Sequence, residues 1–358
     1  MRYRYEGLVV NETATTAATK TVDLDFVEPI SRLTVQFKGT NNGSTPTAHG
    51  AKMVSLLEIA DGSDIMYSLS GIEAQALNYY ENGDLPFQVN EYRNDVMNIQ
   101  TFQLNFGRYK YDPELALDPN RFRNLQLKIT HNKASGGSAP DAGALWVYAD
   151  LFDEKRVNPM GFLQSKEHYT YSLTSSGVES IDLPTDLTIR KMLVQSLSGG
   201  KQPWQQYNKV KLTEDEGRKT VINDIKTSDL SKTLKRHPHM FETLRGIGTG
   251  SVVDHFCAST YDMESTLGAD STSLSTVTMP QDYGGTIGIN ADNAEHFQAH
   301  IRGAMPHGAL EVPFGMQEDL RDWYDLNGVG ALKLALTAGS SVGSSSTAEV
   351  VLQQLRRY

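Results

Sequence analysis

Short runs of alternating apolar and polar residues recur along the chain, separated by stretches rich in Gly, Ser, Thr and Asn. In NLQLKIT (124–130) leucine and isoleucine alternate with polar residues, and ALKLALT (331–337) alternates in the same way. Successive side chains of a strand point to opposite faces of a sheet, so this pattern predicts strands with one buried face. No regular succession of strands and long helices appears, and we therefore expect an all-β fold.

The strand pattern is repeated within the chain. VDLDFVEPISRLTVQ, which begins at Val22, aligns with IDLPTDLTIRKMLVQ, which begins at Ile181, at an offset of 159 residues (181 minus 22). The matched pairs are Val22/Ile181, Asp23/Asp182, Leu24/Leu183, Ile30/Ile189, Val35/Val194 and Gln36/Gln195. Such self-similarity is typical of duplicated modules.

A second pair of matched blocks follows, at 57–70 and 210–226. In each, an acidic turn that contains Gly joins two apolar runs. Glycine tolerates the positive φ of a tight turn, so both blocks predict a β-hairpin. A short helix is expected after each hairpin: Ser70 and Glu73 have the spacing of a capping box, and Thr227 or Ser228 is expected to cap the second helix.

The later blocks match at a larger offset. FQLNFG (102–107) corresponds to LEVPFG (310–315), and the closing runs 144–152 and 348–355 also correspond. The offset grows from 156 (225 minus 69) to 208 (310 minus 102), so the second copy holds 52 extra residues (208 minus 156). We expect a long loop insertion at about 235–308, on the surface, because a buried irregular loop would leave backbone polar groups unpaired.

The domain organisation follows from the repeat. Eight short strands and one helix per copy favour two tandem jelly-roll β-sandwiches over a barrel or a doubly wound sheet. We expect a first roll at 1–153, a linker at 154–164 around Pro159, and a second roll at 165–358. A length of 358 residues suits two domains.

Charge and cysteine content narrow the function classes. A formal net charge of -10 argues against specific nucleic-acid binding, which needs a basic face. Arg2, Arg4, Arg356 and Arg357 are either solvated charge or a small cationic patch, if the termini converge. The single Cys257 excludes an intramolecular disulfide framework. We find no apolar signal segment and no run of the ~18 apolar residues that a membrane helix needs, and we expect a soluble protein that is not secreted by that route.

Histidines in the insertion are candidate metal ligands. His237, His239, His255 and Cys257 mimic a zinc set, but no C-x-x-C pair accompanies them, and polar loop residues are the favoured interpretation. On a helix His296 and His300, with Glu295 beside them, would share one face. They lack the H-E-x-x-H order, so a surface or inter-subunit position is favoured.

Three further motifs have a functional and a structural interpretation. GIGTGS (246–251) superficially suggests a phosphate loop, but no lysine stands at the Walker position, and a flexible loop is favoured. The acidic turns 61–64 and 214–216 lack the EF-hand register for Ca²⁺. Trp204 and Trp323 are expected to pack rather than to bind sugars. No nucleophile, base and orienting group share one locality, so we expect no enzyme activity, no catalytic, cofactor or metal site, and no cofactor.

Three segments carry a resemblance to a known family: ISRLTVQF (30–37), the turn EIADGSDIMYSLSG (58–71) and LDPNRFRNLQLKI (117–129). With the duplication, they make the chain similar to double jelly-roll major capsid proteins of tailless icosahedral viruses, such as the tectivirus, corticovirus and finnlakevirus coat proteins. The resemblance implies a bacteriophage-like virion protein, assembled in the host cytoplasm. It also implies homotrimers with six upright rolls that form pseudo-hexagonal capsomers.

The resemblance implies partners as well. They are neighbouring capsomers, minor capsid and penton proteins, and internal membrane lipid at the capsomer base, with the insertion at the outer end. Two other functions remain open from the residues: a carbohydrate- or receptor-binding protein, since jelly rolls also serve as lectins and spikes, and a cupin-like enzyme, which needs a clustered His/Glu metal site.

Overall fold

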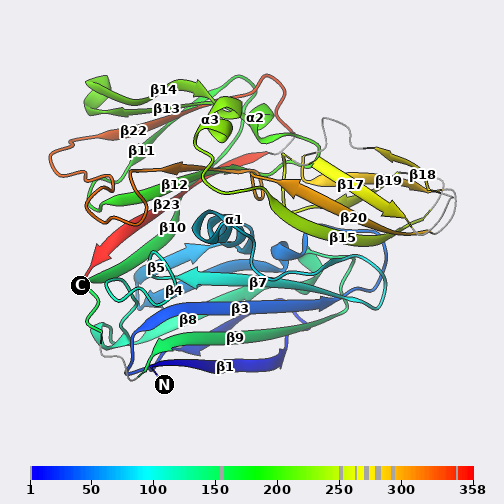
Figure 1. Cartoon of the computed structure of the whole chain (residues 1–358), viewed down its shortest axis with the longest axis horizontal. Coiled ribbons are helices and arrows are strands. Elements are labelled where there is room, and N and C mark those ends of the chain that lie inside the picture. The colour runs from blue at the N-terminus through cyan, green and yellow to red at the C-terminus, as the bar shows by residue number, and fades with distance from the viewer. Residues whose placement is uncertain are drawn as a thin grey trace.

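The structure, a computed structural model, describes residues 2–153, 157–249, 253–262, 264–269, 274–278, 284–291, 295–343 and 346–358. Its strands form two stacked sandwiches, with the first lower and the second upper in Figure 1, and an appended group of strands at one end. The shorter elements are the helices α1 (Gly71–Asn82), α2 (Pro203–Gln206) and α3 (Thr227–Thr233) and the 3-10 turns η1 (Gly50–Met53), η2 (Pro119–Arg121), η3 (Lys133–Ser135) and η4 (Asp215–Gly217).

The first sandwich, roll one, consists of two four-stranded antiparallel sheets. Their strands are β1 (Tyr3–Thr13), β2 (Ala18–Asp23), β3 (Ile30–Thr40), β4 (Val54–Asp61), β5 (Asp64–Leu69), β7 (Met97–Asn105), β8 (Leu125–His131) and β9 (Ala142–Phe152). One sheet has the order β1-β9-β3-β7 and the other β2-β8-β4-β5. The expected alternation is present, since Leu125, Leu127 and Ile129 are buried between the sheets.

The second sandwich, roll two, repeats this order strand for strand. Its strands are β10 (Gly161–Ser172), β11 (Val178–Leu183), β12 (Ile189–Ser196), β13 (Tyr207–Glu214), β14 (Lys219–Lys226), β21 (Ala309–Pro313), β22 (Leu332–Ala338) and β23 (Thr347–Arg357). They pair as β10-β23-β12-β21 and β11-β22-β13-β14. The predicted all-β double jelly roll is confirmed, and the topology adds a matched pair, β1 and β10, that the sequence comparison missed.

The two rolls share one continuous sheet. Strand β10 pairs in parallel with β5, with Ser165 opposite Tyr67 and Lys166 opposite Ser68, so two four-stranded sheets become one of eight strands. Strand β10 begins at Gly161, inside the expected linker. Residues 154–156 of that linker lie outside the described residues, and the division at 153 and 165 stays a prediction.

The hairpins and helices follow the expected chemistry, with one correction. Gly62 and Gly217 occupy the two hairpin turns with φ of 63° and 94°. Ser70 and Glu73 form the capping box of α1. The expected cap of α3 is wrong: the N-cap position is Lys226, which makes no side-chain cap. The hydroxyl of Thr227 instead donates to the carbonyl of Tyr207 and ties α3 to the sheet.

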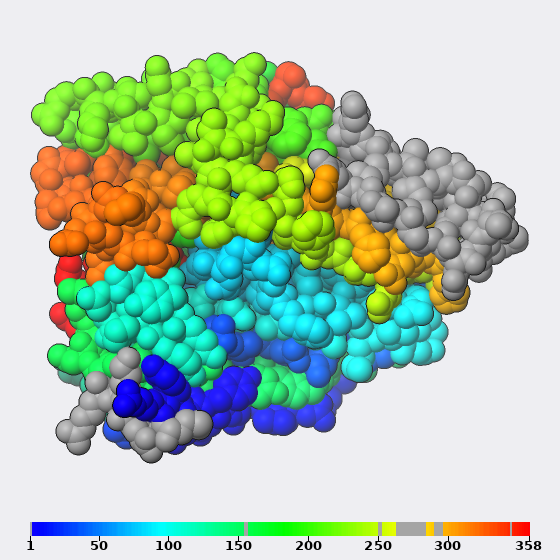
Figure 2. All heavy atoms as spheres, viewed as in Figure 1, coloured from blue at the N-terminus to red at the C-terminus, as the bar shows by residue number. Residues whose placement is uncertain are grey.

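The insertion is a small β unit rather than a loop. It holds β15 (Met240–Gly248), β16 (Asp254–Cys257), β17 (Glu264–Ala269), β18 (Leu274–Thr278), β19 (Thr286–Ala291) and β20 (Glu295–Gly303). These strands form sheets β17-β20-β15-β6 and β16-β19-β18, where β6 (Asn90–Glu91) comes from roll one. Their buried side chains, with Tyr92 of roll one, form a separate hydrophobic core. This core stabilises strands where the sequence suggested an irregular loop. The unit projects at the end away from both termini (Figures 1 and 2).

Candidate functional site

The seam between the two rolls is built around a buried helix. Helix α1 lies between the rolls (Figure 1), and the ten residues from Gly71 to Tyr80 are all buried. One side of the helix faces β7, where Asn78 accepts a hydrogen bond from the backbone of Gln103 at 2.8 Å. The other side faces roll two, where the hydroxyl of Tyr80 donates to the carbonyl of Ala309 at 2.8 Å.

A buried ion pair lies in this seam. Nζ of Lys191 lies 2.6 Å from Oε1 of Glu311, and the two side chains are 0% and 3% exposed. Lys191 also donates to the backbone carbonyl of Tyr80 at 2.9 Å, which joins β12 to α1. Burial lowers the pKa of Lys191 to about 8, with the positive charge of Arg190 acting in the same direction and Glu311 opposing it. The pair is a structural contact, because no solvent reaches it.

A buried polar junction connects roll one with the insertion and, through a hydrogen bond from Gln195 to the carbonyl of His307, with roll two. The hydroxyl of Ser259 donates to Oε2 of Glu242 at 2.7 Å and lies 2.9 Å from Nε2 of His49. Asn90 donates to the same carboxylate at 2.7 Å. The ring of His49 contacts that of His307 edge to face, with centroids 4.8 Å apart. A second chain of bonds closes the junction through Gln75, which contacts His307 at 2.9 Å.

Ser259, His49 and Glu242 are the residue types of a hydrolytic triad, but their hydrogen bonds run in the wrong directions for catalysis. Nδ1 of His49 accepts from the backbone N–H of Ala51 at 3.1 Å, so Nε2 carries the proton and donates to Ser259. Burial lowers the pKa of His49 to about 3 and raises that of Glu242 to about 7. A serine whose oxygen accepts a hydrogen bond from a histidine N–H is not activated as a nucleophile, because that histidine nitrogen cannot take up the serine proton. We therefore assign the junction to the docking of the insertion.

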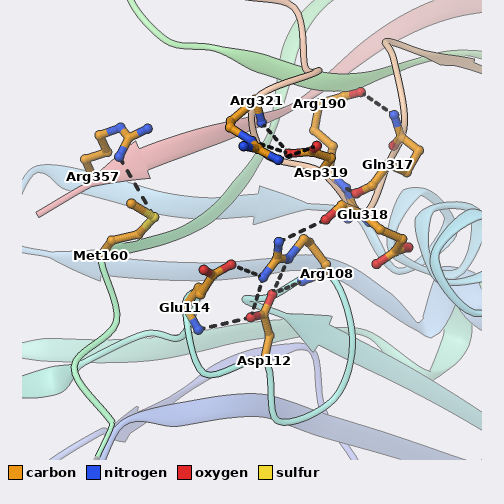
Figure 3. A network of polar contacts seen from close by, with 10 residues as sticks. All are labelled: Arg108, Asp112, Glu114, Met160, Arg190, Gln317, Glu318, Asp319, Arg321 and Arg357. Carbon is orange, nitrogen blue, oxygen red and sulfur yellow. Dashed lines mark hydrogen bonds and ion pairs between the residues drawn. The ribbon is translucent and has the colours of Figure 1, made fainter.

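A charged cleft of about 750 Å³ lies between the rolls beside the C-terminal strand. Figure 3 shows Arg108 of roll one at its centre, with Nε 2.7 Å from Oδ2 of Asp112 and Nη1 2.9 Å from the backbone carbonyl of Glu318 in roll two. The hydrogen bond to Asp112 raises the pKa of Arg108. Across the cleft Arg321 pairs with Asp319 at 3.1 Å. Each ion pair lies within one roll, and the hydrogen bond from Arg108 to the carbonyl of Glu318 joins the two rolls.

The candidate zinc ligands are not brought together. His237 lies against α1, with Nε2 3.0 Å from the carbonyl of Tyr80, whereas His255 and Cys257 lie on β16. Burial raises the pKa of the Cys257 thiol to about 11, which makes it a poor nucleophile or ligand. No group of three or more His, Cys, Asp or Glu side chains able to hold a metal ion occurs among the residues that the structure describes.

The other motifs also have structural positions. His296 and His300 lie on strand β20 rather than on a helix. Residues 246–248 of GIGTGS belong to β15, so the expected loop is wrong there, while Gly250 and Ser251 lie outside the described residues. A side chain at Gly246 would collide with the rings of Phe256 and Phe297, which explains a glycine in this strand.

The acidic turns and tryptophans are occupied by protein contacts. Asp61 accepts backbone hydrogen bonds from Arg123 and Asn124, and Glu214 pairs with Lys219 at 2.7 Å. Trp323 is 3% exposed and packs against Arg190 and a small apolar cluster, and Trp204 packs against the core of roll two.

The basic ends of the chain lie at one end of the molecule (Figure 1), but Arg4 and Arg356 are ion-paired. Arg4 lies 3.0 Å from Glu28, and Arg356 pairs with Asp64. Arg357 is exposed beside Met160. In the described part of the chain, no helix is both long and apolar enough for a membrane span.

Comparison with known proteins adds structural relatives only. No family profile and no curated protein sequence matches the chain. The major capsid protein P2 of bacteriophage PM2 aligns over 99% of this chain and 98% of its own, with a TM-score of 0.57 and 8% identity. The chain has the fold of a double jelly-roll coat protein. The major capsid protein of Sulfolobus turreted icosahedral virus aligns over 98% and 96%, with a TM-score of 0.58 and 12% identity.

A third double jelly roll, VP54 of PBCV-1, covers 99% of this chain and 93% of its own, with a TM-score of 0.59 and 10% identity. The viruses concerned infect different kinds of host, so the likeness does not single out a bacteriophage. It extends over both rolls and the insertion, and the predicted double jelly-roll resemblance is confirmed at the level of the fold.

Proposed function

We propose that this chain is a major capsid protein that assembles as homotrimeric, pseudo-hexagonal capsomers in an icosahedral virion shell. The observation that supports this most strongly is the near-complete alignment of both rolls with three viral coat proteins. The seam adds a physical reason: the shared sheet, α1 and the Lys191–Glu311 pair hold two similar rolls in one fixed relation. Three such chains supply six similar sectors, which can tile a facet.

The position of the insertion supports an orientation. It lies at the end of the molecule opposite the termini (Figure 2), so we place the insertion on the outer face and the termini at the capsomer base. Arg2 and Arg357 are then exposed charges at the base, available for internal lipid or minor capsid and penton proteins. We also propose assembly in the host cytoplasm and no specific nucleic-acid binding; the net charge of -10 supports the second of these.

The chain is proposed to act through its interfaces and not as an enzyme. The Ser259–His49 contact has the wrong proton direction for nucleophilic attack, and Glu242 is occupied by hydrogen bonds. At the charged cleft, the carboxylates of Asp112, Glu114 and Asp319 are paired with arginines.

Electron microscopy of the purified chain, expressed alone, tests the proposal. We expect blocks with pseudo-hexagonal outlines, and shells or flat sheets of them at high concentration. A chain that stays monomeric and binds glycans on an array would contradict the capsid function and favour a lectin-like one.

A further inference from the structure

A pocket of about 390 Å³ lies where the insertion meets roll one. Its walls are the segment 84–90, which leads from α1 to β6, and solvent-facing residues of β15 and β20. Its volume lies within the range of about 300–1,000 Å³ that is typical of small-molecule sites. Glu242 of the polar junction also lines the pocket and is only 7% exposed, so the pocket adjoins a buried, hydrogen-bonded part of the molecule.

Two phenylalanines line this pocket. Phe87 is 65% and Phe241 is 69% exposed, more than any other Phe, Tyr or Trp side chain among the residues that the structure describes. Asn90 pairs with Leu244 in parallel strands, and each phenylalanine stands three residues before its paired residue (90 minus 87, 244 minus 241). A ligand that covers such rings is stabilised because apolar surface leaves water, and exposed apolar surface in a pocket therefore indicates a binding site.

The polar side chains of the pocket are held in place by one another. Nε of Arg245 donates to Oε1 of Gln298 at 3.3 Å, which turns the amide nitrogen of Gln298 toward Nε2 of His300, 3.2 Å away. That ring nitrogen accepts, so Nδ1 of His300 carries the proton and donates to the hydroxyl of Thr243 at 3.2 Å. The hydroxyl hydrogen of Thr243 is then available to a ligand.

Arg245 is the cationic group of the pocket. It is exposed, and Gln298 is its hydrogen-bond partner in the described part of the chain, so both Nη groups are available. Two parallel hydrogen bonds from a guanidinium match the geometry of a carboxylate. Asp84 lines the pocket from the other wall, and its exposed carboxylate can accept hydrogen bonds from hydroxyl groups.

We infer that this pocket binds a pyranose sugar that carries a carboxylate, such as a uronic or sialic acid unit of a cell-surface glycan. A pyranose has C–H groups on its ring faces and hydroxyls around its edge. The ring faces would pack on Phe87 and Phe241, the carboxylate would bind the Nη groups of Arg245, and hydroxyls would reach Asp84 and Thr243.

The inference adds a binding activity to the proposed capsid function. Access to the pocket on an assembled particle rests on the proposed placement of the insertion at the outer face. Binding by the purified chain does not, so the two proposals can fail separately.

The test is surface plasmon resonance of the purified full-length chain with multivalent polymer probes that carry glucuronic acid, N-acetylneuraminic acid or glucose. We expect binding of at least one acidic probe and, because glucose lacks the carboxylate, roughly 10- to 100-fold weaker binding of the glucose probe. Arg245→Gln should weaken the acidic probe by a similar factor, and Phe241→Ala should weaken it roughly tenfold. Both residues are exposed, so the circular dichroism spectrum should not change.

Two control variants lie outside the pocket. Tyr109→Ala removes an aromatic ring that is 52% exposed, and Arg321→Gln removes a positive charge whose side chain is 90% exposed. Both should bind the acidic probe as wild type does. The inference is wrong if neither acidic probe binds, if the glucose probe binds equally well, or if Arg245→Gln and Phe241→Ala bind like the controls. It is also wrong if Phe241→Ala lowers the mass of the protein in solution, because the ring then packs between copies of the chain.

Discussion

Nζ of Lys191 lies 2.6 Å from Oε1 of Glu311 in the seam, and both side chains are almost fully buried. The pair connects neighbouring strands of roll two, and through the carbonyl of Tyr80 it reaches α1 of roll one. Two rolls of one chain are thus held by a contact that neither roll could make alone.

Removal of one partner of this pair should be costly. Lys191→Met leaves the Glu311 carboxylate buried, with Arg236, 3.8 Å away, as its remaining ion-pair partner among the described residues. We expect the free energy of unfolding to fall by about 3–5 kcal/mol, measured by urea denaturation. The double variant Lys191→Met/Glu311→Met should recover most of the loss, because no buried charge remains. A single variant as stable as wild type would contradict the burial of the pair.

The polar junction predicts a specific pH dependence. The pKa of His49 is about 3 in the folded protein against an ordinary 6.5, so only the unfolded chain gains a proton as the pH falls below 6.5. His49 therefore contributes stability above pH 6.5 that is lost on acidification toward pH 3, with a slope of at most ~1.4 kcal/mol per pH unit. His49→Gln, which keeps a donor toward Ser259, should lose less stability between pH 6.5 and 4 than wild type.

Glu242 provides the control with the opposite sign. Its pKa is raised to about 7, so its contribution is present at low pH and is lost as the pH rises from about 4.5 to 7. Glu242→Gln should therefore lose more stability on acidification than wild type. The free energy of unfolding of both variants is measured by urea denaturation as a function of pH. If the His49→Gln and Glu242→Gln curves run parallel to the wild-type curve, these groups do not titrate as their burial requires.

Deletion of residues 249–293 should leave the two rolls folded, since roll one has no equivalent of this segment. The structure predicts a loss of stability on deletion. Phe256 is lost from the core that contains Tyr92, and Glu242 loses the hydrogen bond from the Ser259 hydroxyl. We expect a native circular dichroism spectrum with a lower melting temperature. Ser259→Ala alone should cost about 1–3 kcal/mol, because the buried carboxylate of Glu242 loses the hydroxyl donor and keeps the backbone N–H of residue 259 and the amide of Asn90. A deletion variant without folded structure would show that the insertion belongs to the roll cores.

The strand register of roll one is tested by Leu127→Asp. Leu127 is 0% exposed between the two sheets, and an unpaired charge there costs several kcal/mol. We expect insoluble or unfolded protein. Thr130→Asp, on the outer side of the same strand, should change stability by less than about 1 kcal/mol. Soluble, assembled Leu127→Asp protein would contradict the register.

The duplication was predictable from sequence where both copies bury the same face. β2-β3 and β11-β12 kept matched residues because their inner faces have the same role in both rolls. The pair β1 and β10 was missed because Ser165 of β10 is buried in the seam, whereas its equivalent Tyr5 is exposed. Because β1 and β10 lie in different surroundings, one exposed and one buried, they share no pattern of apolar and polar residues.

The insertion and the junction were harder to predict. Glycine-rich residues 246–248 suggested a loop, yet they lie in strand β15. The glycine at position 246 is needed there because two phenylalanine rings leave no room for a side chain. His49 and Ser259 are 210 residues apart in sequence, and no local pattern connects them. Only the packing of three parts of the chain brings these polar side chains together.

The central claim is that three copies of this chain close into one ring of six rolls, and light scattering of the purified chain at micromolar concentration tests it most directly. The account predicts a mass of 118.8 kDa, three times the 39.6 kDa of one chain. A stable species of 39.6 kDa under the same conditions would contradict it.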